Sequence, residues 1–335
     1  MIELKKNTLI FRFPEVHSDA VCQIGFQRTL RIPDDNNSYP LPPGLGGFHL
    51  EHVEDHAEKV SDTMIKRGGI MLPMHQSEAM WMYFPPRSEG YPFAIKIAAG
   101  KINAITGDSW SETLDSDKQD YVVIPRQPWI DGFCVDEGLI RQFVAMPLGE
   151  GYSVEEQITG SSEFGGLQII AFPMKKSFYD EMQRKKQAEV FEERILYCRA
   201  GVEEDADTMG LAPGGLMHQQ IYDDEYGAEA WDTENTSRCF IHIINSKQWG
   251  KITSQPIPIP PPTAKDYSRA GLPWFEYYND SKKSVKGSKI LSQLDSLATK
   301  MFKSGKGQLG DNKSVEIPKI IDVSPKKPEV KDGSW

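Results

Sequence analysis

The feature that most restricts the fold is a series of short apolar runs, rich in Ile, Val, Phe and Tyr, that Gly and Pro interrupt. β-Branched and aromatic residues in short runs favour strands, and punctuation such as FPPRSEGYP and MPLGEG predicts turns. We therefore expect a mainly β, α+β body built as an antiparallel sandwich or a barrel-like sheet with a few helices. The expected strands are Thr8–Phe13, Val21–Ile32, Ala79–Phe84, Phe93–Ala98, Tyr121–Ile124, Gly138–Met146, Gly166–Phe172 and Arg238–Ile244.

Three stretches have helical periodicity instead. His49–Met64 and Lys176–Arg199 place apolar residues three and four apart among many charges, which predicts two helices in the body. A third helix is expected over 287–302, where one stripe is apolar and the opposite side is polar. That stripe consists of Ile290, Leu291, Leu294, Leu297, Met301 and Phe302.

Composition and charge divide the chain near its end. The Pro-rich connector 255–262, QPIPIPPP, favours polyproline II and a semi-rigid link. From Ser281 onward there are 12 Lys, no Arg and 6 acidic residues, a net charge of +6; the whole chain is −10, so the rest carries −16. We predict a globular body over 1–278 and a flexible, Lys-rich tail over 279–335 that bears the amphipathic helix.

Several classes of function are disfavoured by composition. A net charge of −10 argues against nucleic-acid binding, because neutralising phosphates needs surplus Lys and Arg. The N-terminus lacks a secretory pattern and no apolar run is long enough to span a membrane, so we expect a soluble, cytoplasmic protein. The four cysteines, Cys22, Cys134, Cys198 and Cys239, form no C-x-x-C pair and are expected to be reduced and mostly buried.

No metal or cofactor is predicted from the motifs. His52 and His56 are four residues apart on an expected helix, but Val53 stands where a zinc protease needs Glu, so an exposed helix face is favoured. A P-loop, a dinucleotide-binding glycine pattern and a nucleophile elbow are missing from the sequence. The acidic runs 203–207 and 223–225 lack the spacing of a calcium loop.

A set of longer phrases resembles a known group of sequences, and the resemblance covers roughly residues 30–278. The chain is similar to a family of uncharacterised soluble proteins, mostly bacterial, that has no established activity. The resemblance implies one coherent unit and supplies no catalytic residue. The phrases are RIPDD, YPLPPGLGGF, RGGIMLPMHQSEAMW, PFAIKIAAGKINAITG, QDYVVIPRQPWIDGFC, IRQFVAMPLGEGYSVEEQITG, GGLQI, TMGLAPGG, RCFIHIINS and AGLPWFEYY.

Two segments could carry acid–base chemistry. In the first, His75 and Glu78 precede an aromatic run that includes Trp81, a pattern typical of a ligand pocket or of a strand at the edge of a core. In the second, Glu155, Glu156 and Glu163 follow a Gly turn, and paired carboxylates there could serve as acid and base. The favoured alternative is a capped turn or short helix with Ser153 as N-cap and Glu156 three residues later.

A further strand, PFAIKIAAGKINA, offers Lys96, Lys101 and Asn103 as contacts for an anionic ligand. The A-I-K phrase is similar to a kinase strand, but the accompanying kinase motifs are missing. We favour the alternative that the lysines are outward residues of an alternating strand.

These observations predict a non-catalytic binding or assembly module that acts through protein–protein contacts or self-association. The tail stripe is expected to dock on protein, in cis or in trans, because its few lysines make a poor basic face for peripheral membrane contact. The alternative is a hydrolase or carbohydrate-active enzyme with an unrecognised site. Its residues would come from His75, Glu78, Arg141, Glu155, Glu156 and Glu163.

Overall fold

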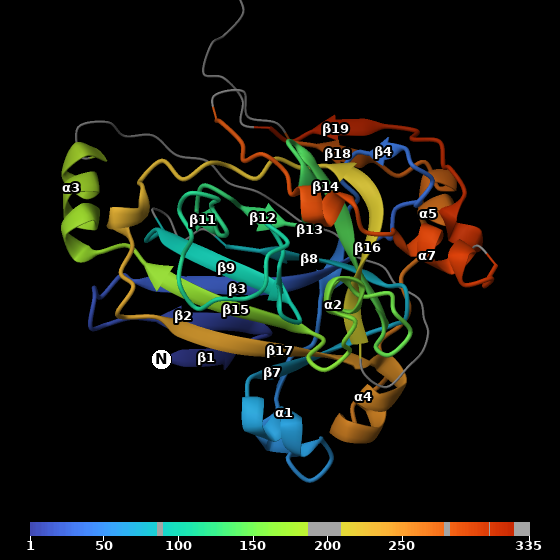
Figure 1. Cartoon of the computed structure of the whole chain (residues 1–335), viewed down its shortest axis with the longest axis horizontal. Coiled ribbons are helices and arrows are strands. Elements are labelled where there is room, and N and C mark those ends of the chain that lie inside the picture. Colours follow the sequence, from blue (N-terminus) through green and yellow to red (C-terminus); the bar gives the residue numbers. More distant parts are fainter. Residues whose placement is uncertain (86–89, 187–208, 278–281, 308, 325–335) are drawn as a thin grey trace, which may run out of the picture.

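A computed structural model describes residues 1–85, 90–186, 209–277, 282–307 and 309–324 of the chain. Two large β-sheets pack on one shared core, with short helices around their ends (Figure 1). The predicted mainly β, α+β body is therefore confirmed, as two packed sheets rather than a closed barrel.

The first sheet runs in the order β1-β2-β3-β8-β14-β16-β4, with β12, β13 and β5 attached to β8, β14 and β3. Its pairs are antiparallel except for β4, which lies parallel to β16. The strands are β1 (Ile2–Lys5), β2 (Thr8–Arg12), β3 (Val21–Thr29), β4 (Ser38–Tyr39), β5 (Gly44–Gly47), β8 (Ala79–Tyr83), β12 (Trp129–Ile130), β13 (Gly132–Asp136), β14 (Leu139–Pro147) and β16 (Met209–His218).

The second sheet runs in the order β10-β9-β15-β17-β7-β6, with β11 paired to β9. Here β17 and β7 are parallel and the other pairs are antiparallel. The strands are β6 (Glu51–His52), β7 (Ile70–Met74), β9 (Phe93–Ala99), β10 (Ile102–Asn103), β11 (Val122–Ile124), β15 (Leu167–Pro173) and β17 (Ser237–Asn245); a separate parallel pair joins β18 (Trp274–Glu276) to β19 (Ile320–Asp322).

The core explains why the apolar runs became strands. Phe26 of β3 and Phe143 of β14 come from the first sheet, and Ile95 of β9 and Ile169 of β15 come from the second, and all are fully buried in one cluster. Burying such side chains contributes roughly 1.5–3 kcal/mol each relative to exposure. All eight predicted strands are present, within three residues of their expected ends.

One long strand was not predicted from sequence. β16 contains Pro213, Gly214 and Gly215, residues that normally indicate a turn. The pairing with β14 shifts register beside Pro213, which accommodates the missing N–H. A Cβ on Gly215 would approach the backbone oxygen of Pro33 to 2.4 Å, so the glycine is needed for close packing of two backbones.

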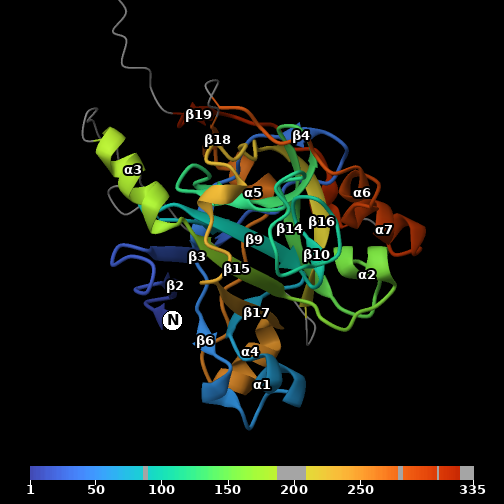
Figure 2. The same cartoon turned by 60° about the vertical axis from the view of Figure 1, so that its left-hand side comes forward.

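Short helices close the ends of the sheets. α1 and α4 lie side by side at one end of the molecule (Figures 1 and 2), where Met64 and Trp249 share a small core. Of the predicted helix Lys176–Arg199, the structure describes α3, and residues 187–199 lie outside the described part. The helices are α1 (Asp62–Arg67), α2 (Val154–Thr159), α3 (Lys176–Lys186), α4 (Ser246–Thr253), α5 (Ala264–Arg269), α6 (Lys289–Ser292) and α7 (Leu297–Lys303), with single 3₁₀ turns at Glu54–His56, Ala228–Ala230 and Gly310–Asn312.

The predicted helix over His49–Met64 is wrong. Glu51 and His52 form β6, which pairs with β7, and Glu54–His56 is only a 3₁₀ turn. The α-helix begins later, at Asp62, where the Ser61 hydroxyl accepts a hydrogen bond from the Met64 N–H. Pairing with a distant strand overrides the local periodicity here, because it satisfies the same backbone groups.

The single tail helix predicted over 287–302 is instead two short helices, α6 and α7. Gln157 of α2 bonds both backbone groups of Asp295, at 3.0 Å to its oxygen and 2.9 Å from its N–H. Ser296 then caps α7. In the described tail, α6 contacts β13 and α7 contacts β16, and Figure 2 shows both helices beside β16; residues 278–281, 308 and 325–335 lie outside the described residues.

Candidate functional site

Lys96 is buried among polar groups of the segment that follows β9, although an outward-facing position was favoured from sequence. Its side chain is 1% exposed, and its ammonium lies 2.5 Å from the Asp120 carboxylate. The ammonium also donates to the Ser111 hydroxyl (2.9 Å) and the Thr113 backbone oxygen (2.5 Å). The expectation of an exposed lysine is wrong because β9 is covered by the segment that follows it, and these three acceptors match the ammonium's three N–H donors.

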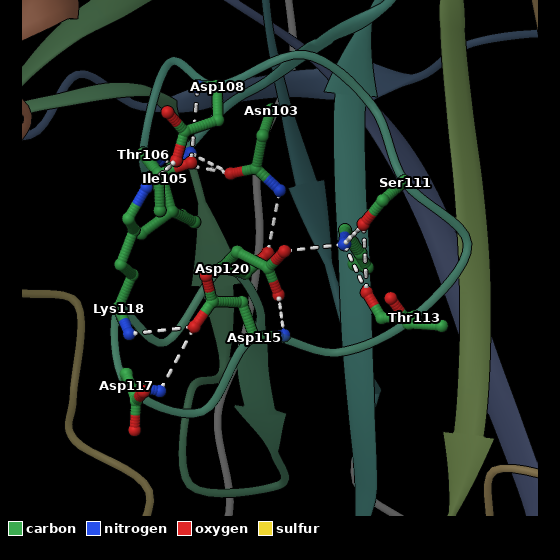
Figure 3. Close-up of polar contacts among 11 residues, drawn as sticks. Asn103, Ile105, Thr106, Asp108, Ser111, Thr113, Asp115, Asp117, Lys118 and Asp120 are labelled. Atoms are coloured by element: carbon green, nitrogen blue, oxygen red, sulfur yellow. Dashed lines mark hydrogen bonds and ion pairs between the residues drawn. The ribbon is translucent and has the colours of Figure 1, made fainter.

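Asn103 organises the same covering segment (Figure 3). Its side-chain oxygen accepts from the N–H groups of Ile105 (2.8 Å) and Thr106 (3.0 Å). Its amide nitrogen donates to the backbone oxygen of Asp120 at 2.7 Å. The Asp120 carboxylate in turn accepts from the Asp115 N–H at 3.0 Å. Lys96 and Asn103 thus meet around Asp120, in an arrangement that fastens residues 103–120 over β9.

Lys101 belongs to a different environment. Its ammonium lies 4.0 Å from the centre of the Phe164 ring, and the Arg67 guanidinium lies 4.7 Å from the same ring. Arg67 also donates to the Phe164 backbone oxygen at 3.2 Å. Of the three residues predicted to contact an anion together, the structure brings only Lys96 and Asn103 into one cluster.

His75 and Glu78 are brought together by a tight turn between β7 and β8. Glu78 is 1% exposed; one oxygen accepts from the Arg28 side chain at 2.5 Å and the other from the His75 N–H at 2.8 Å. Burial raises the pKa of the Glu78 carboxyl, although Arg28 acts to lower it. The His75 ring donates from Nε2 to the Pro258 backbone oxygen at 2.9 Å.

Trp81 continues along β8 from Glu78 and packs among aromatic rings. Its ring centre lies 5.7 Å from that of Tyr83 and 6.3 Å from that of Trp129. Trp129 contacts Tyr277 edge-on at 4.8 Å. The side chain of Trp81 is buried, so this residue lies inside the aromatic cluster and not on an open binding surface.

Glu155 and Glu156 lie in the first turn of α2 and bond to backbone groups. The predicted capping box is confirmed: the Ser153 hydroxyl accepts from the Glu156 N–H, and the Glu156 carboxylate accepts from the Ser153 N–H. The other Glu156 oxygen accepts from Gly149 (2.7 Å) and Gly151 (2.9 Å). Glu155 accepts from the Gly165 N–H at 2.9 Å, and burial raises its pKa.

The remaining acid–base candidates lie elsewhere. Glu163 is exposed in the loop after α2, and its backbone oxygen accepts from Arg67. Arg141 of β14 donates to the Gly214 oxygen (3.0 Å) and pairs with Asp34 at 3.4 Å. Asp34 also accepts from the Ala298 N–H at 2.6 Å, which fastens α7 to the body. The six predicted residues therefore occupy separate positions, with only His75–Glu78 and Glu155–Glu156 in contact or adjacent.

Sequence reasoning missed Asp131, which lies between β12 and β13 and is 3% exposed. Its carboxylate accepts from the Gln219 amide at 2.7 Å, and its own N–H donates back to Gln219 at 2.9 Å. Burial raises the pKa of Asp131 to about 7, against the effect of its hydrogen bonds. The one available signal was a lone acidic residue inside the apolar run Trp129–Phe133.

The tail stripe divides between the core and the surface. Leu291, Leu297 and Met301 are buried against the body, and Leu294 is partly buried. Ile290 is 41% exposed and Phe302 is 75% exposed. The apolar stripe thus docks in cis, and Ile290 and Phe302 are the stripe residues that another protein could reach.

Two small depressions in the described part of the molecule each have room for about one ordered water. Trp129, Tyr277 and Gln219 are among the residues that line the first, and Arg67, Phe164 and His242 are among those of the second. Burial lowers the pKa of His242, whose ring bonds the Gly68 backbone oxygen at 2.9 Å.

The described residues contain neither a metal-binding cluster nor a helix that could span a membrane. In that part of the chain, no three His, Cys, Asp or Glu side chains gather in a way that could hold a metal ion. Cys22, Cys134 and Cys239 are free and buried, and Cys198 lies outside the described part. No described helix combines the length and apolar character needed to cross a bilayer.

Comparison with known proteins adds no assignment. No family model, curated protein or solved structure matches the chain. The family resemblance of residues 30–278 therefore stays a prediction.

Proposed function

We propose that this protein is a non-catalytic binding module that acts through protein–protein contacts. The proposal rests on one observation: the candidate acid–base groups already accept hydrogen bonds from other parts of the fold. Both oxygens of Glu78 and both oxygens of Glu156 accept hydrogen bonds from the protein itself. Groups committed in this way stabilise local backbone and are poorly placed to exchange protons with a substrate.

The surface supports the same conclusion. Small-molecule sites are concave, lined by apolar residues and large enough to enclose most of a ligand. The two depressions described above are water-sized, whereas several large apolar side chains of the described residues are exposed. Ile257, Ile259, Ile290 and Phe302 are 43%, 73%, 41% and 75% exposed. Contacts with another protein would use this kind of surface.

The same proposal includes a protein partner or self-association and a cytoplasmic location. It does not include nucleic acid as a partner. The hydrolase alternative would need its residues around one hollow. Glu78, Arg141 and Glu156 instead lie in three separate sets of contacts. No specific observation therefore favours the enzyme over the binding module.

Native mass spectrometry of the full-length chain tests the proposal. The tagged protein is measured alone and again after incubation with an extract of its own cells and mild re-isolation. We expect an added mass of protein size at fixed stoichiometry, or a homo-oligomer of the chain. A bare monomer in both samples, or a bound small molecule alone, would contradict the proposal.

A further inference from the structure

Residues 255–262, here called the strap, run between α4 and α5 and are held to the body by their backbone oxygens. The His75 ring donates to the Pro258 oxygen at 2.9 Å, and Arg28 donates from Nη1 to the Ile259 oxygen at 2.7 Å. Both donors are themselves held by Glu78, which accepts from the Arg28 Nε and the His75 N–H. The strap is thus fastened to a buried ion pair.

The backbone of the strap is rich in acceptors and poor in donors. Five of its eight residues are proline, so only Gln255, Ile257 and Ile259 have an N–H. Such a segment cannot join a β-ladder as an added strand, and its composition favours polyproline II. The structure assigns it neither helix nor strand.

One side of the strap is turned outward. Pro256 and Ile259 are both exposed and stand three residues apart, the repeat of a polyproline II helix. Ile257 is also 43% exposed, whereas Pro260, three residues further along, is buried. The strap therefore exposes three apolar side chains, those of Pro256, Ile257 and Ile259, beside the polar Gln255, and its backbone is anchored at Pro258 and Ile259.

We infer that the strap is a recognition surface for a partner domain with an aromatic-lined groove that takes polyproline II segments. This inference rests on the proposed function and names its surface. Aromatic rings pack on Pro and Ile side chains, so such a groove matches the exposed apolar side chains of the strap. Anchoring by His75 and Arg28 fixes the backbone before binding, which reduces the ordering cost.

Strand addition and helix-in-groove binding fit the strap less well. Strand addition needs a regular series of N–H donors, and most positions of the strap lack one. A helix is excluded by the consecutive prolines Pro260, Pro261 and Pro262, because each ring clashes with the preceding turn. Polyproline II recognition is the binding mode that suits a proline-rich backbone with few N–H donors and exposed apolar side chains.

The test uses the full-length chain and purified, isotope-labelled SH3 and WW domains as probes. We expect at least one domain to show chemical-shift changes at its groove Trp and Tyr residues, reversed by competition with a proline-rich peptide. Ile259→Asp should weaken that binding by about tenfold or more, because it places a charge in a desolvated apolar contact. Ile259 is 73% exposed, so this variant should fold normally.

Phe302→Ser is the matched control, since it also removes an exposed apolar side chain but lies on α7, outside the strap. It should bind the probe as the wild type does. The inference is overturned if no domain shows groove shifts, or if Ile259→Asp binds as well as the wild type. If Ile259→Asp still binds a natural partner, the inference about the strap is wrong but the proposed function stands. If the wild type binds no partner, the proposed function itself is wrong.

Discussion

Replacing Lys96 by Met should destabilise the protein strongly. The substitution keeps an unbranched apolar stem but removes three N–H donors from a buried position. Asp120 would lose the cation 2.5 Å away, and Ser111 and Thr113 would lose a donor. Removing one partner of a buried ion pair costs about 3–5 kcal/mol, so we expect the free energy of unfolding to fall by about that amount.

Denaturant unfolding followed by circular dichroism measures the change. Lys118→Met is the matched control, because it breaks a 2.8 Å pair with Asp108 on the exposed side of the same segment. Its unfolding midpoint should stay at the wild-type value. Asp120→Asn and the double variant complete a mutant cycle, in which we expect a coupling of about 1–3 kcal/mol.

A small effect would refute the reasoning. If Lys96→Met unfolds within about 1 kcal/mol of the wild type, the ion pair does not stabilise the fold. The earlier prediction that Lys96 contacts a ligand would then regain support, because a ligand-binding lysine can be removed without loss of stability. A coupling near zero would show that Asp120 does not depend on Lys96.

Three further predictions concern carboxyl groups that accept hydrogen bonds within the fold and their partners. Burial raises the pKa of Asp131 to about 7 in the folded chain, whereas its value in the unfolded chain is near 4. Between about pH 4 and pH 7 the folded chain therefore keeps a proton on Asp131 that the unfolded chain has lost. The free energy of unfolding should therefore fall as pH rises through that window in the wild type but not in Asp131→Asn; parallel pH profiles in urea unfolding would contradict this. Glu156→Gln places an amide against four donors and should cost about 1–3 kcal/mol, whereas Glu163→Gln at an exposed position should change nothing; equal unfolding midpoints would exclude the capping role. Arg28→Met leaves Glu78 buried without its cation and should cost about 3–5 kcal/mol; a free energy of unfolding within about 1 kcal/mol of the wild type would contradict this.

Local features of the sequence were enough to predict part of this structure. The capping box at Ser153 and Glu156 was predictable because its donors and acceptors lie within four residues. The strands were predictable because apolar and β-branched runs satisfy the requirements of a buried sheet. The helix at His49–Met64 failed because β7, a distant strand, pairs with Glu51 and His52.

The candidate site depended on contacts between distant residues. Lys96 and Asp120 are 24 positions apart in sequence, so the local pattern of β9 could not reveal the ion pair. Asp131 was missed because its partner Gln219 is 88 positions away. Pro258 approaches His75 across 183 positions, so the Pro-rich connector could be recognised as polyproline-prone but not placed.

Hydroxyl-radical footprinting of the chain, alone and in its re-isolated complex, tests most directly whether the protein acts through its surface. We expect oxidation of Ile257 and Ile259 to fall on binding, because both are exposed in the free chain. Phe302 reports on the tail in the same experiment, and loss of its oxidation would place the contact there instead. If the complex leaves every exposed apolar side chain as reactive as in the free chain, the protein does not bind through these contacts and the account is contradicted.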